Sequence, residues 1–473
     1  MAEVGGVPAR RLGLDLGAPL DRPRTSTYLR EFRWYRRSRL WVVPSAGAGA
    51  ALALAAATLS VDHFLITGPA PFPIFGGEPE TARTMLSLIA TAVATLTALI
   101  LTIVAVIIQL ATQALSPRAV RTFLQDAHSH LTIGTFVGTF TFALVVLQQF
   151  SLTYDAEADT LTSLSVTVAF VLAVVSLGMF ISYVDHIVHQ ARVTSIIDRI
   201  GNETRYAIRQ EYPTEDERPR HVTGTIPEHE PSHTITSVNN GVILEIDVSR
   251  LMKAIARCNV TIVMVPAVGD FIPTGARLLE VYGDADIDLK ALMKTVDIDA
   301  ERSIMQDVPF GFRLLIDIAE RSLSTGINDP TTAVQVVDQL HDLLRQLGTR
   351  PFPSGWYADD EGAPRLYVPQ PTWDLYVALA FEEIRHHGAS SLQVVRRIRS
   401  AVLDLLENLP EERHPALHRQ IRLLDETAEW AFRSEAEREA ATHADAQGIG
   451  SGGGFGPIVG EDDTASGVTQ TEG

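Results

Sequence analysis

Cysteine is nearly absent from this chain, which has one cysteine, Cys258, among 473 residues. A single cysteine excludes an intrachain disulfide and any site that needs paired thiols. A lone thiol suits a reducing cytoplasm, and we expect Cys258 to fill part of a hydrophobic core.

Positive charge is also scarce, because 39 Lys and Arg residues stand against 57 Asp and Glu residues and the net charge is -18. Nucleic acids bind to basic surfaces, so this balance excludes a nucleic acid partner. The chain also has no Gly-x-Ser-x-Gly elbow, phosphate loop or dinucleotide-binding fingerprint. We therefore expect no catalytic residues, no metal and no cofactor.

Charge of either sign is missing from four long stretches, and these stretches define the class of the protein. A membrane-spanning helix needs about 20 apolar residues, and each stretch is long enough. The first lacks a convincing cleavage site and is followed by three more, so we interpret it as a membrane helix rather than a signal peptide. The predicted spans are residues 40–61, 84–117, 131–154 and 160–184.

Basic residues beside the spans predict the orientation in the membrane. Arginines precede the first span and follow the second and fourth spans, whereas acidic residues dominate the other two loops. The sequence therefore predicts a multi-pass protein of the cytoplasmic (inner) membrane with both termini in the cytoplasm. The arginines are Arg33, Arg36, Arg37, Arg39, Arg118, Arg121, Arg192 and Arg199.

The second span carries its small and polar residues on one side. At 100° per residue they fall within roughly 80° of the helix surface, while Leu86, Ile100 and Ile107 face away. Polar groups are costly in hydrocarbon, so we expect this stripe to face protein or water instead of lipid. The candidate pore or helix-interface residues are Thr91, Thr95, Thr102, Gln109 and Gln113.

The third span has two glycines, Gly134 and Gly138, on one helix face. This spacing allows two helix backbones to approach closely. The packing partner is either another helix of the chain or a second subunit. We expect the protein to self-associate within the lipid bilayer.

The rest of the chain predicts a cytoplasmic α+β region, so the fold class is an α-helical membrane protein with four transmembrane helices, a small β module and a helical domain. Short β-branched runs at 241–246, 260–265 and 277–282 predict strands, and the spacing after residue 297 is helical. Residues 351–371 predict an ordered loop or a short hairpin. The predicted segments are a cytoplasmic N-terminal segment (1–39), a transmembrane domain (40–190), a helix extension and linker (191–233), the β module (234–296), the helical domain (297–443) and a disordered tail (444–473).

Residues 269–275 resemble the turn of biotinyl and lipoyl carrier domains, because glycines stand at both ends. A carrier domain needs a modified lysine on the hairpin after this turn, but the chain has Gly283-Asp-Ala-Asp286 there. We therefore expect a structural β module without a covalent cofactor.

The sharpest motif of the soluble half runs from residue 324 to residue 332, and two interpretations of it stay open. In the structural one, Gly326 ends a helix in the left-handed conformation, Asp329 caps the next helix and Pro330 occupies its first turn. In the functional one, polar groups at that helix N-terminus hold an anion or a metal-bound ligand of unknown identity. The candidate turn or ligand residues are Gly326, Asn328, Asp329, Pro330 and Thr331.

Four segments together resemble the bacterial membrane-protein family called domain of unknown function 2254. They are residues 109–118 in the second span, 134–140 in the third, the Gly-Asp-Phe turn at 269–271 and Gly-Ile-Asn-Asp-Pro at 326–330. The chain departs from the family at Thr325, where the family usually has proline, which loosens that turn. The resemblance implies a four-helix membrane unit with a cytoplasmic domain, and it implies no established activity.

Three classes of function remain. The first is a homo-oligomeric channel or permeation protein in which the polar stripe lines a wet path under regulation by the cytoplasmic domain. The second is a non-conducting membrane scaffold or sensor, in which the stripe is a dry helix interface. The third is a membrane-bound enzyme, for which the sequence nominates no nucleophile, acid–base pair or metal cage.

Overall fold

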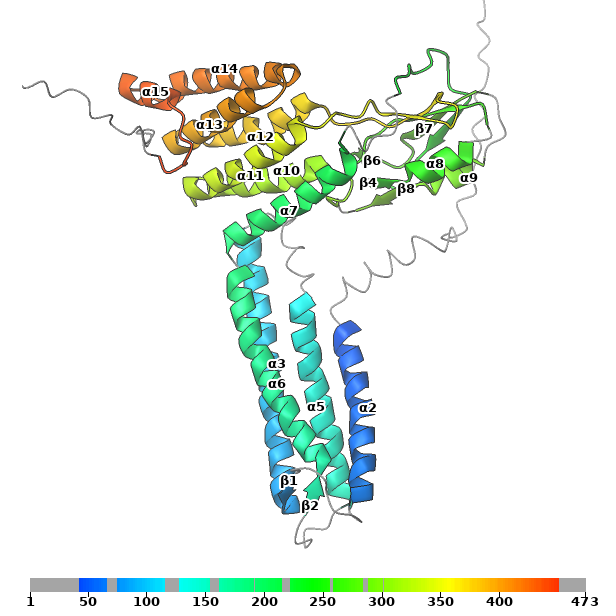
Figure 1. Cartoon of the computed structure of the whole chain (residues 1–473), viewed down its shortest axis with the longest axis vertical. Helices are drawn as coiled ribbons and strands as arrows, with labels where there is room; N and C mark the ends of the chain where they lie inside the picture. The colour runs from blue at the N-terminus through cyan, green and yellow to red at the C-terminus, as the bar shows by residue number, and fades with distance from the viewer. Residues whose placement is uncertain are drawn as a thin grey trace, which may run out of the picture.

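The computed structural model of the chain describes residues 42–65, 75–114, 127–153, 161–190, 192–214, 222–255, 258–283, 288–300 and 302–450. A bundle of long helices carries a region of mixed helices and sheets at one end (Figure 1). This region comprises the described residues from 192 to 450 and is called the soluble region. The predicted N-terminal segment and the arginines at positions 33–39, 118 and 121 lie outside the described residues.

Four of the described helices are long and apolar enough to cross a membrane, as the sequence predicts. They are α2 (Val42–Leu65), α3 (Pro79–Ala114), α5 (Ala127–Thr153) and α6 (Leu164–Gln190). Far from the soluble region, β1 (Phe75–Gly77) pairs antiparallel with β2 (Leu161–Ser163). Because the helices alternate in direction, α2 begins and α6 ends at the same end of the bundle, beside the soluble region (Figure 1).

The central helix of the bundle is α5, which contacts α2, α3 and α6. Half of its membrane-length segment is buried, compared with 17% of the corresponding segments of α2 and α3. Its Phe142 packs in a cluster with residues of all three other helices, and its Phe136 packs with Ile100 of α3 and Tyr183 of α6. The bundle is therefore organised around one helix rather than around a central space.

Asp62, near the end of α2, joins that helix to α6. Its carboxylate is 4% exposed and accepts hydrogen bonds from the backbone N–H groups of Leu164, at 2.6 Å, and Ser165, at 3.1 Å. These N–H groups belong to the first turn of α6 and have no partner within the helix. A carboxylate at this position also interacts favourably with the positive end of the helix dipole. The cap explains why an acid is buried in an apolar segment.

The helix α7 (Val193–Glu211) is a separate helix, whereas the sequence predicts that the fourth membrane helix continues through this segment. α6 ends at Gln190, and α7 runs in a new direction under the soluble helices (Figure 1). Its apolar face, which includes Ile196, Ile200 and Ile208, is buried against α10 and α11. An amphipathic helix is stabilised by covering such a face, so α7 belongs to the core of the helical domain.

The helical spacing predicted after residue 297 is confirmed by a stack of helices above α7 (Figure 1). One hydrophobic core joins them to α7, and its largest fully buried side chains include Phe312, Tyr376 and Phe381. The elements are α10 (Val308–Ser322), α11 (Pro330–Gly348), α12 (Trp373–His387), α13 (Leu392–Asn408), the 3-10 turn Glu411–Arg413, α14 (His414–Ala431) and α15 (Glu435–Thr442).

The β module contains the three predicted strands, β4 (Gly241–Ile246), β5 (Thr261–Met264) and β7 (Arg277–Tyr282). A three-stranded sheet has the order β6-β4-β8, and a five-stranded sheet has the order β3-β7-β5-β10-β9. The glycines at 269 and 275 both have positive φ, which fits their expected role in turns. The other elements are β3 (His233–Thr236), α8 (Val248–Ile255), β6 (Phe271–Ile272), α9 (Leu289–Met293) and β8 (Val296–Asp299).

A hairpin from the later part of the chain completes the larger sheet. β9 (Trp356–Ala358) and β10 (Pro364–Tyr367) are antiparallel to each other, and β10 pairs in parallel with β5. The segment 351–371 is thus a hairpin, one of the two expected forms. Because it enters the sheet, the β module and the helical domain are not separated at residue 297.

The segment 444–450 corrects the predicted disordered tail. Asp445 is buried, and its carboxylate accepts hydrogen bonds from the backbone N–H groups of Gln447, Gly448 and Gly450. The guanidinium of Arg396 in α13 donates to the carbonyl oxygen of Gly450 at 3.3 Å. The amino-acid composition does not reveal that this loop is ordered, because the order comes from one carboxylate that accepts from three of the loop's own N–H groups. The rest of the predicted tail lies outside the described residues.

Candidate functional site

The polar stripe of α3 faces outward from the bundle. Thr91, Thr95 and Thr102 are exposed, whereas Leu86 and Ile100 on the opposite side are fully buried in the bundle. The three hydroxyl groups donate to the carbonyl oxygens of Ser87, Thr91 and Ala98 at 2.8, 2.8 and 2.9 Å. The described helices of one chain therefore leave the stripe uncovered, with each of these hydroxyl protons already bonded within the helix.

The stripe also forms one wall of a shallow groove. The other wall belongs to α5, so the groove follows the junction of two membrane-length helices. Its lining residues are Ser87, Ala90, Thr91, Ala94, Thr95 and Ala98 of α3 and Phe140, Leu144 and Leu147 of α5. A row of small side chains beside larger apolar ones is a surface into which another helix packs well.

The outward face of α6 has a different character. Its Phe170, Val174 and Ile181 are 53%, 55% and 63% exposed. Large aliphatic and aromatic side chains suit contact with lipid tails. α3 also exposes large side chains, Leu88 and Leu101, but it carries the row of exposed threonines as well.

The two glutamines predicted for the stripe lie toward the soluble end of α3. Gln109 is exposed, and the side chain of Gln113 lies outside the described residues. The structure therefore places four of the five candidate stripe residues on the outward surface, and α3 has no charged residue between Ser87 and Gln109.

The glycine pair of α5 packs against α2 of the same chain. Gly47 of α2 lies directly against Gly134, and a Cβ atom placed on Gly138 would lie 3.2 Å from the carbonyl oxygen of Gly47. Backbones this close leave no room for a larger side chain. The open question of the partner is thus answered within one chain, because α2 occupies the face that holds Gly134 and Gly138.

The turn before α11 has the predicted cap but not the predicted left-handed glycine. Asp329 is the N-cap of α11, and its two carboxylate oxygens accept from the N–H of Thr332, at 3.2 Å, and its hydroxyl, at 2.6 Å. Pro330 opens the helix. The left-handed residue is Asn328, with φ of 49°, and not Gly326. Asparagine tolerates this conformation because its short side chain bonds locally.

The cap geometry favours the structural interpretation of this turn. Both oxygens of Asp329 are occupied by Thr332, which follows in the first turn of α11. Thr331, Asn328 and Gly326 are exposed. Their arrangement is that of a helix start on the surface.

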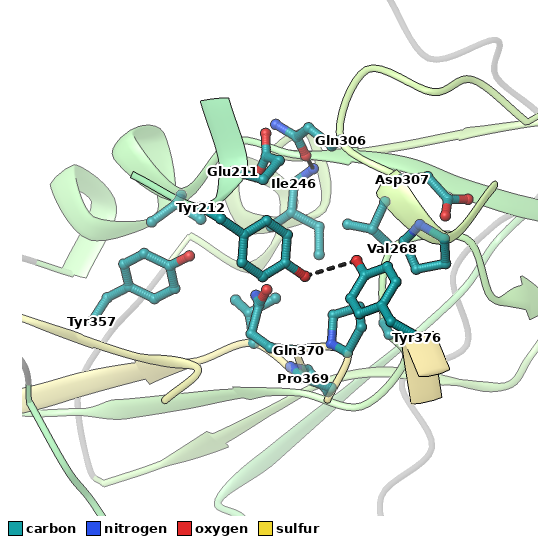
Figure 2. Close-up of a pocket in the computed structure, with 15 residues that line it drawn as sticks. Glu211, Tyr212, Ile246, Val268, Gln306, Asp307, Tyr357, Pro369, Gln370 and Tyr376 are labelled. Atoms are coloured by element: carbon teal, nitrogen blue, oxygen red, sulfur yellow. Dashed lines mark hydrogen bonds between the residues drawn. The ribbon is translucent and has the colours of Figure 1, made fainter. Parts of the chain in front are cut away.

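A site that sequence reasoning missed lies where α7, the two sheets and α12 meet (Figure 2). It is a partly enclosed cavity of about 60 Å³. Glu211, the last residue of α7, and Tyr212 reach it from one side, and the hydroxyl groups of Tyr212 and Tyr376 share a hydrogen bond of 2.8 Å. Prolines and aliphatic side chains complete the wall, together with Tyr357, Gln306, Asp307 and Gln370.

The two acids of this cavity differ in their partners. Asp307 accepts hydrogen bonds from Nε of Arg302, at 2.8 Å, and from the N–H of Phe310, at 3.0 Å. Burial raises the pKa of Asp307, while Arg302 acts in the opposite direction. The carboxylate of Glu211 has no hydrogen bond or ion pair among the described residues, and burial, aided by the nearby charge of Glu245, raises its pKa to about 7. Glu211 therefore changes its charge near neutral pH.

No sequence motif could have indicated this cavity. Its residues come from the end of α7, the end of β4 and start of α8, the turn between β5 and β6, the start of α10, the hairpin and α12. They lie up to 165 positions apart, between Glu211 and Tyr376. The available signal was a single acid at the end of an otherwise amphipathic helix. Such an acid is ordinary on a surface, and only tertiary packing buries it.

Comparison with known proteins supports the resemblance seen in the sequence. A family model described as a predicted membrane protein, domain of unknown function 2254, matches residues 37–404. Uncharacterized proteins of Mycobacterium bovis and Mycobacterium tuberculosis are 27% identical over 414 residues, which cover 85% of this chain and 79% of each relative. No solved structure matches the chain. The chain belongs to the family of predicted membrane proteins called domain of unknown function 2254.

Proposed function

We propose that this membrane protein is a homo-oligomeric permeation protein in which the α3 stripes of neighbouring copies meet around a water-filled path. The observation that carries the proposal is the outward stripe of Thr91, Thr95 and Thr102, beside the groove between α3 and α5. The soluble region, attached through α7, is the regulatory part in this proposal, and we place it in the cytoplasm.

Two physical arguments support a covered or wet stripe. Small side chains allow the backbones of two membrane helices to approach closely, so they are typical of a surface that contacts another helix rather than lipid. The threonine oxygens that donate within the helix keep lone pairs that accept from water. A path lined by hydroxyl groups and alanines carries no formal charge, so we expect weak discrimination between cations and anions.

The proposal is tested with cysteines, because the chain has a single native one. In a Cys258→Ala background, Thr95→Cys places a thiol on the stripe, and Val174→Cys places a matched thiol on the exposed face of α6. We expect the thiol at position 95 to cross-link two copies and to react with a charged, membrane-impermeant reagent. The thiol at position 174 should do neither.

A second function, a non-conducting scaffold or sensor, is favoured by the bonds of the threonine hydroxyls to their own helix. Hydroxyls paired in this way pack dry without a desolvation cost. Cross-linking at position 95 without labelling, together with no ion flux in liposomes, would select this function. If the thiol at position 95 shows neither cross-linking nor labelling, both proposed functions are overturned. The third hypothesis, a membrane-bound enzyme, gains no specific observation from the described residues.

A further inference from the structure

The cavity at the end of α7 contains a carboxylate, that of Glu211, which forms no ion pair with a residue that the structure describes. Among the described residues, no cationic side chain lies within ion-pair distance of the Glu211 carboxylate, and Glu245 of β4 adds a second negative charge nearby. Asp307 differs, because Arg302 contacts its carboxylate at 2.7 Å. A cation entering the cavity would therefore gain attraction from Glu211, and an anion would be repelled.

The cavity walls suit an organic cation of limited size. One water molecule needs about 10 to 15 Å³ of cavity volume. A cavity of about 60 Å³ therefore accepts roughly four to six non-hydrogen atoms. The rings of Tyr212 and Tyr357 line it, and aromatic faces attract cations. Gln370 adds an amide that both donates and accepts (Figure 2).

We propose that this cavity is a binding site for a small organic cation with an ammonium group, which forms an ion pair with Glu211 and rests against the tyrosine rings. The site is independent of the stripe on α3, and it assigns a ligand class to the soluble region.

Proton competition gives the site a characteristic pH dependence. Six described elements contribute titratable or charged groups around Glu211. They are Tyr212 beside it, Glu245 of β4, Asp307 with Arg302 before α10, Tyr357 of β9, Tyr376 of α12, and Arg350 after α11, whose guanidinium donates to the backbone carbonyl oxygen of Tyr212. Because the pKa of Glu211 is about 7, its carboxylate fraction is high at pH 8 and low at pH 6. We expect the apparent affinity for the cation to fall by about tenfold from pH 8 to pH 6.

The test uses ethanolamine as the probe, because it has four non-hydrogen atoms and is cationic at pH 8. Thermal unfolding of the full chain in detergent is measured against ethanolamine concentration, with potassium chloride at matched ionic strength. Ethylene glycol is the uncharged probe of equal size. We expect ethanolamine to raise the unfolding temperature of the native protein in a saturable way, and the two comparison solutes to leave it unchanged.

Variants assign the effect to the cavity. Glu211→Gln should abolish the ethanolamine response, whereas Glu203→Gln, the same change at an exposed position of α7, should retain it. If Glu211→Gln does not fold, Glu245→Gln should still weaken the apparent affinity, because it removes the second negative charge. An equal response in Glu211→Gln, an equal response to ethylene glycol, or no saturable response of the native protein at pH 8 would overturn the proposal.

Discussion

At the scale of single residues, the described carboxylates of Asp62, Asp445 and Glu211 differ in their hydrogen bonding: the first two are buried and bonded, and Glu211 is half-buried without a bonded partner. Asp62 and Asp445 each accept hydrogen bonds from two or more backbone N–H groups. Glu211 has no such donor among the described residues. Its charge therefore costs free energy in the folded state, and this cost depends on pH.

Replacement of Glu211 by glutamine should change how stability depends on pH. The pKa of Glu211 rises from 4.5 to about 7 on folding, so the folded state holds the proton more tightly. The resulting stabilisation is complete below pH 4.5 and is lost as the pH rises through 7. At pH 8 we expect Glu211→Gln to be more stable than the native protein by at most about 3 kcal/mol.

Thermal unfolding of both proteins without added cation, from pH 5 to pH 8, measures this difference. The gap should widen as the pH rises, and Glu203→Gln should follow the native curve because Glu203 is exposed. Parallel curves for Glu211→Gln and the native protein would contradict the raised pKa.

At the scale of elements, the contact between α2 and α5 depends on glycine. Gly138→Leu would push Gly47 and its helix away, because a Cβ atom at position 138 already lies 3.2 Å from a carbonyl oxygen. Overpacking of this kind costs about 1 to 3 kcal/mol. We expect a lower unfolding temperature in detergent.

Gly178→Leu on α6 is the matched control for that change. A Cβ atom at position 178 meets no atom within 4 Å, so this substitution should leave stability nearly unchanged. Equal stability of the two leucine variants would show that the close approach of α2 and α5 does not hold the bundle together.

The cap of α11 allows a second prediction at this scale. Asp329→Ala removes both acceptors used by Thr332 and should lower the stability of the soluble region by about 0.5 to 2 kcal/mol. Asp329→Asn keeps one acceptor and should lose less. A change in cellular function with unaltered unfolding of Asp329→Ala would instead favour a ligand at this turn.

At the scale of the whole molecule, the chain enters the helix bundle at the start of α2 and leaves it at the end of α6. Both points lie at the end of the bundle beside the soluble region (Figure 1). Arg192 and Arg199 follow α6 on that side, and arginines concentrate on the cytoplasmic side of membrane proteins. We therefore expect a reporter fused after Gly450 to be active only if it works in the cytoplasm. Activity of an alkaline phosphatase fusion, together with an inactive cytoplasmic reporter, would reverse the orientation.

The amino-acid sequence by itself determined the features that depend on neighbouring residues. Uncharged runs located the four helices that are long and apolar enough to cross a membrane, β-branched runs located β4, β5 and β7, and the order Asp329-Pro330 located the start of α11. In each case the cause is local, because helix periodicity, strand propensity and capping act over a few positions.

Only the tertiary structure decided which distant segments meet. It gave the glycines of α5 their partner in α2, placed the β9–β10 hairpin beside β5 and separated α7 from α6. It also placed the half-buried Glu211 among residues from six parts of the chain. Burial and electrostatic environment depend on every segment that packs around a side chain, so no local pattern carries them.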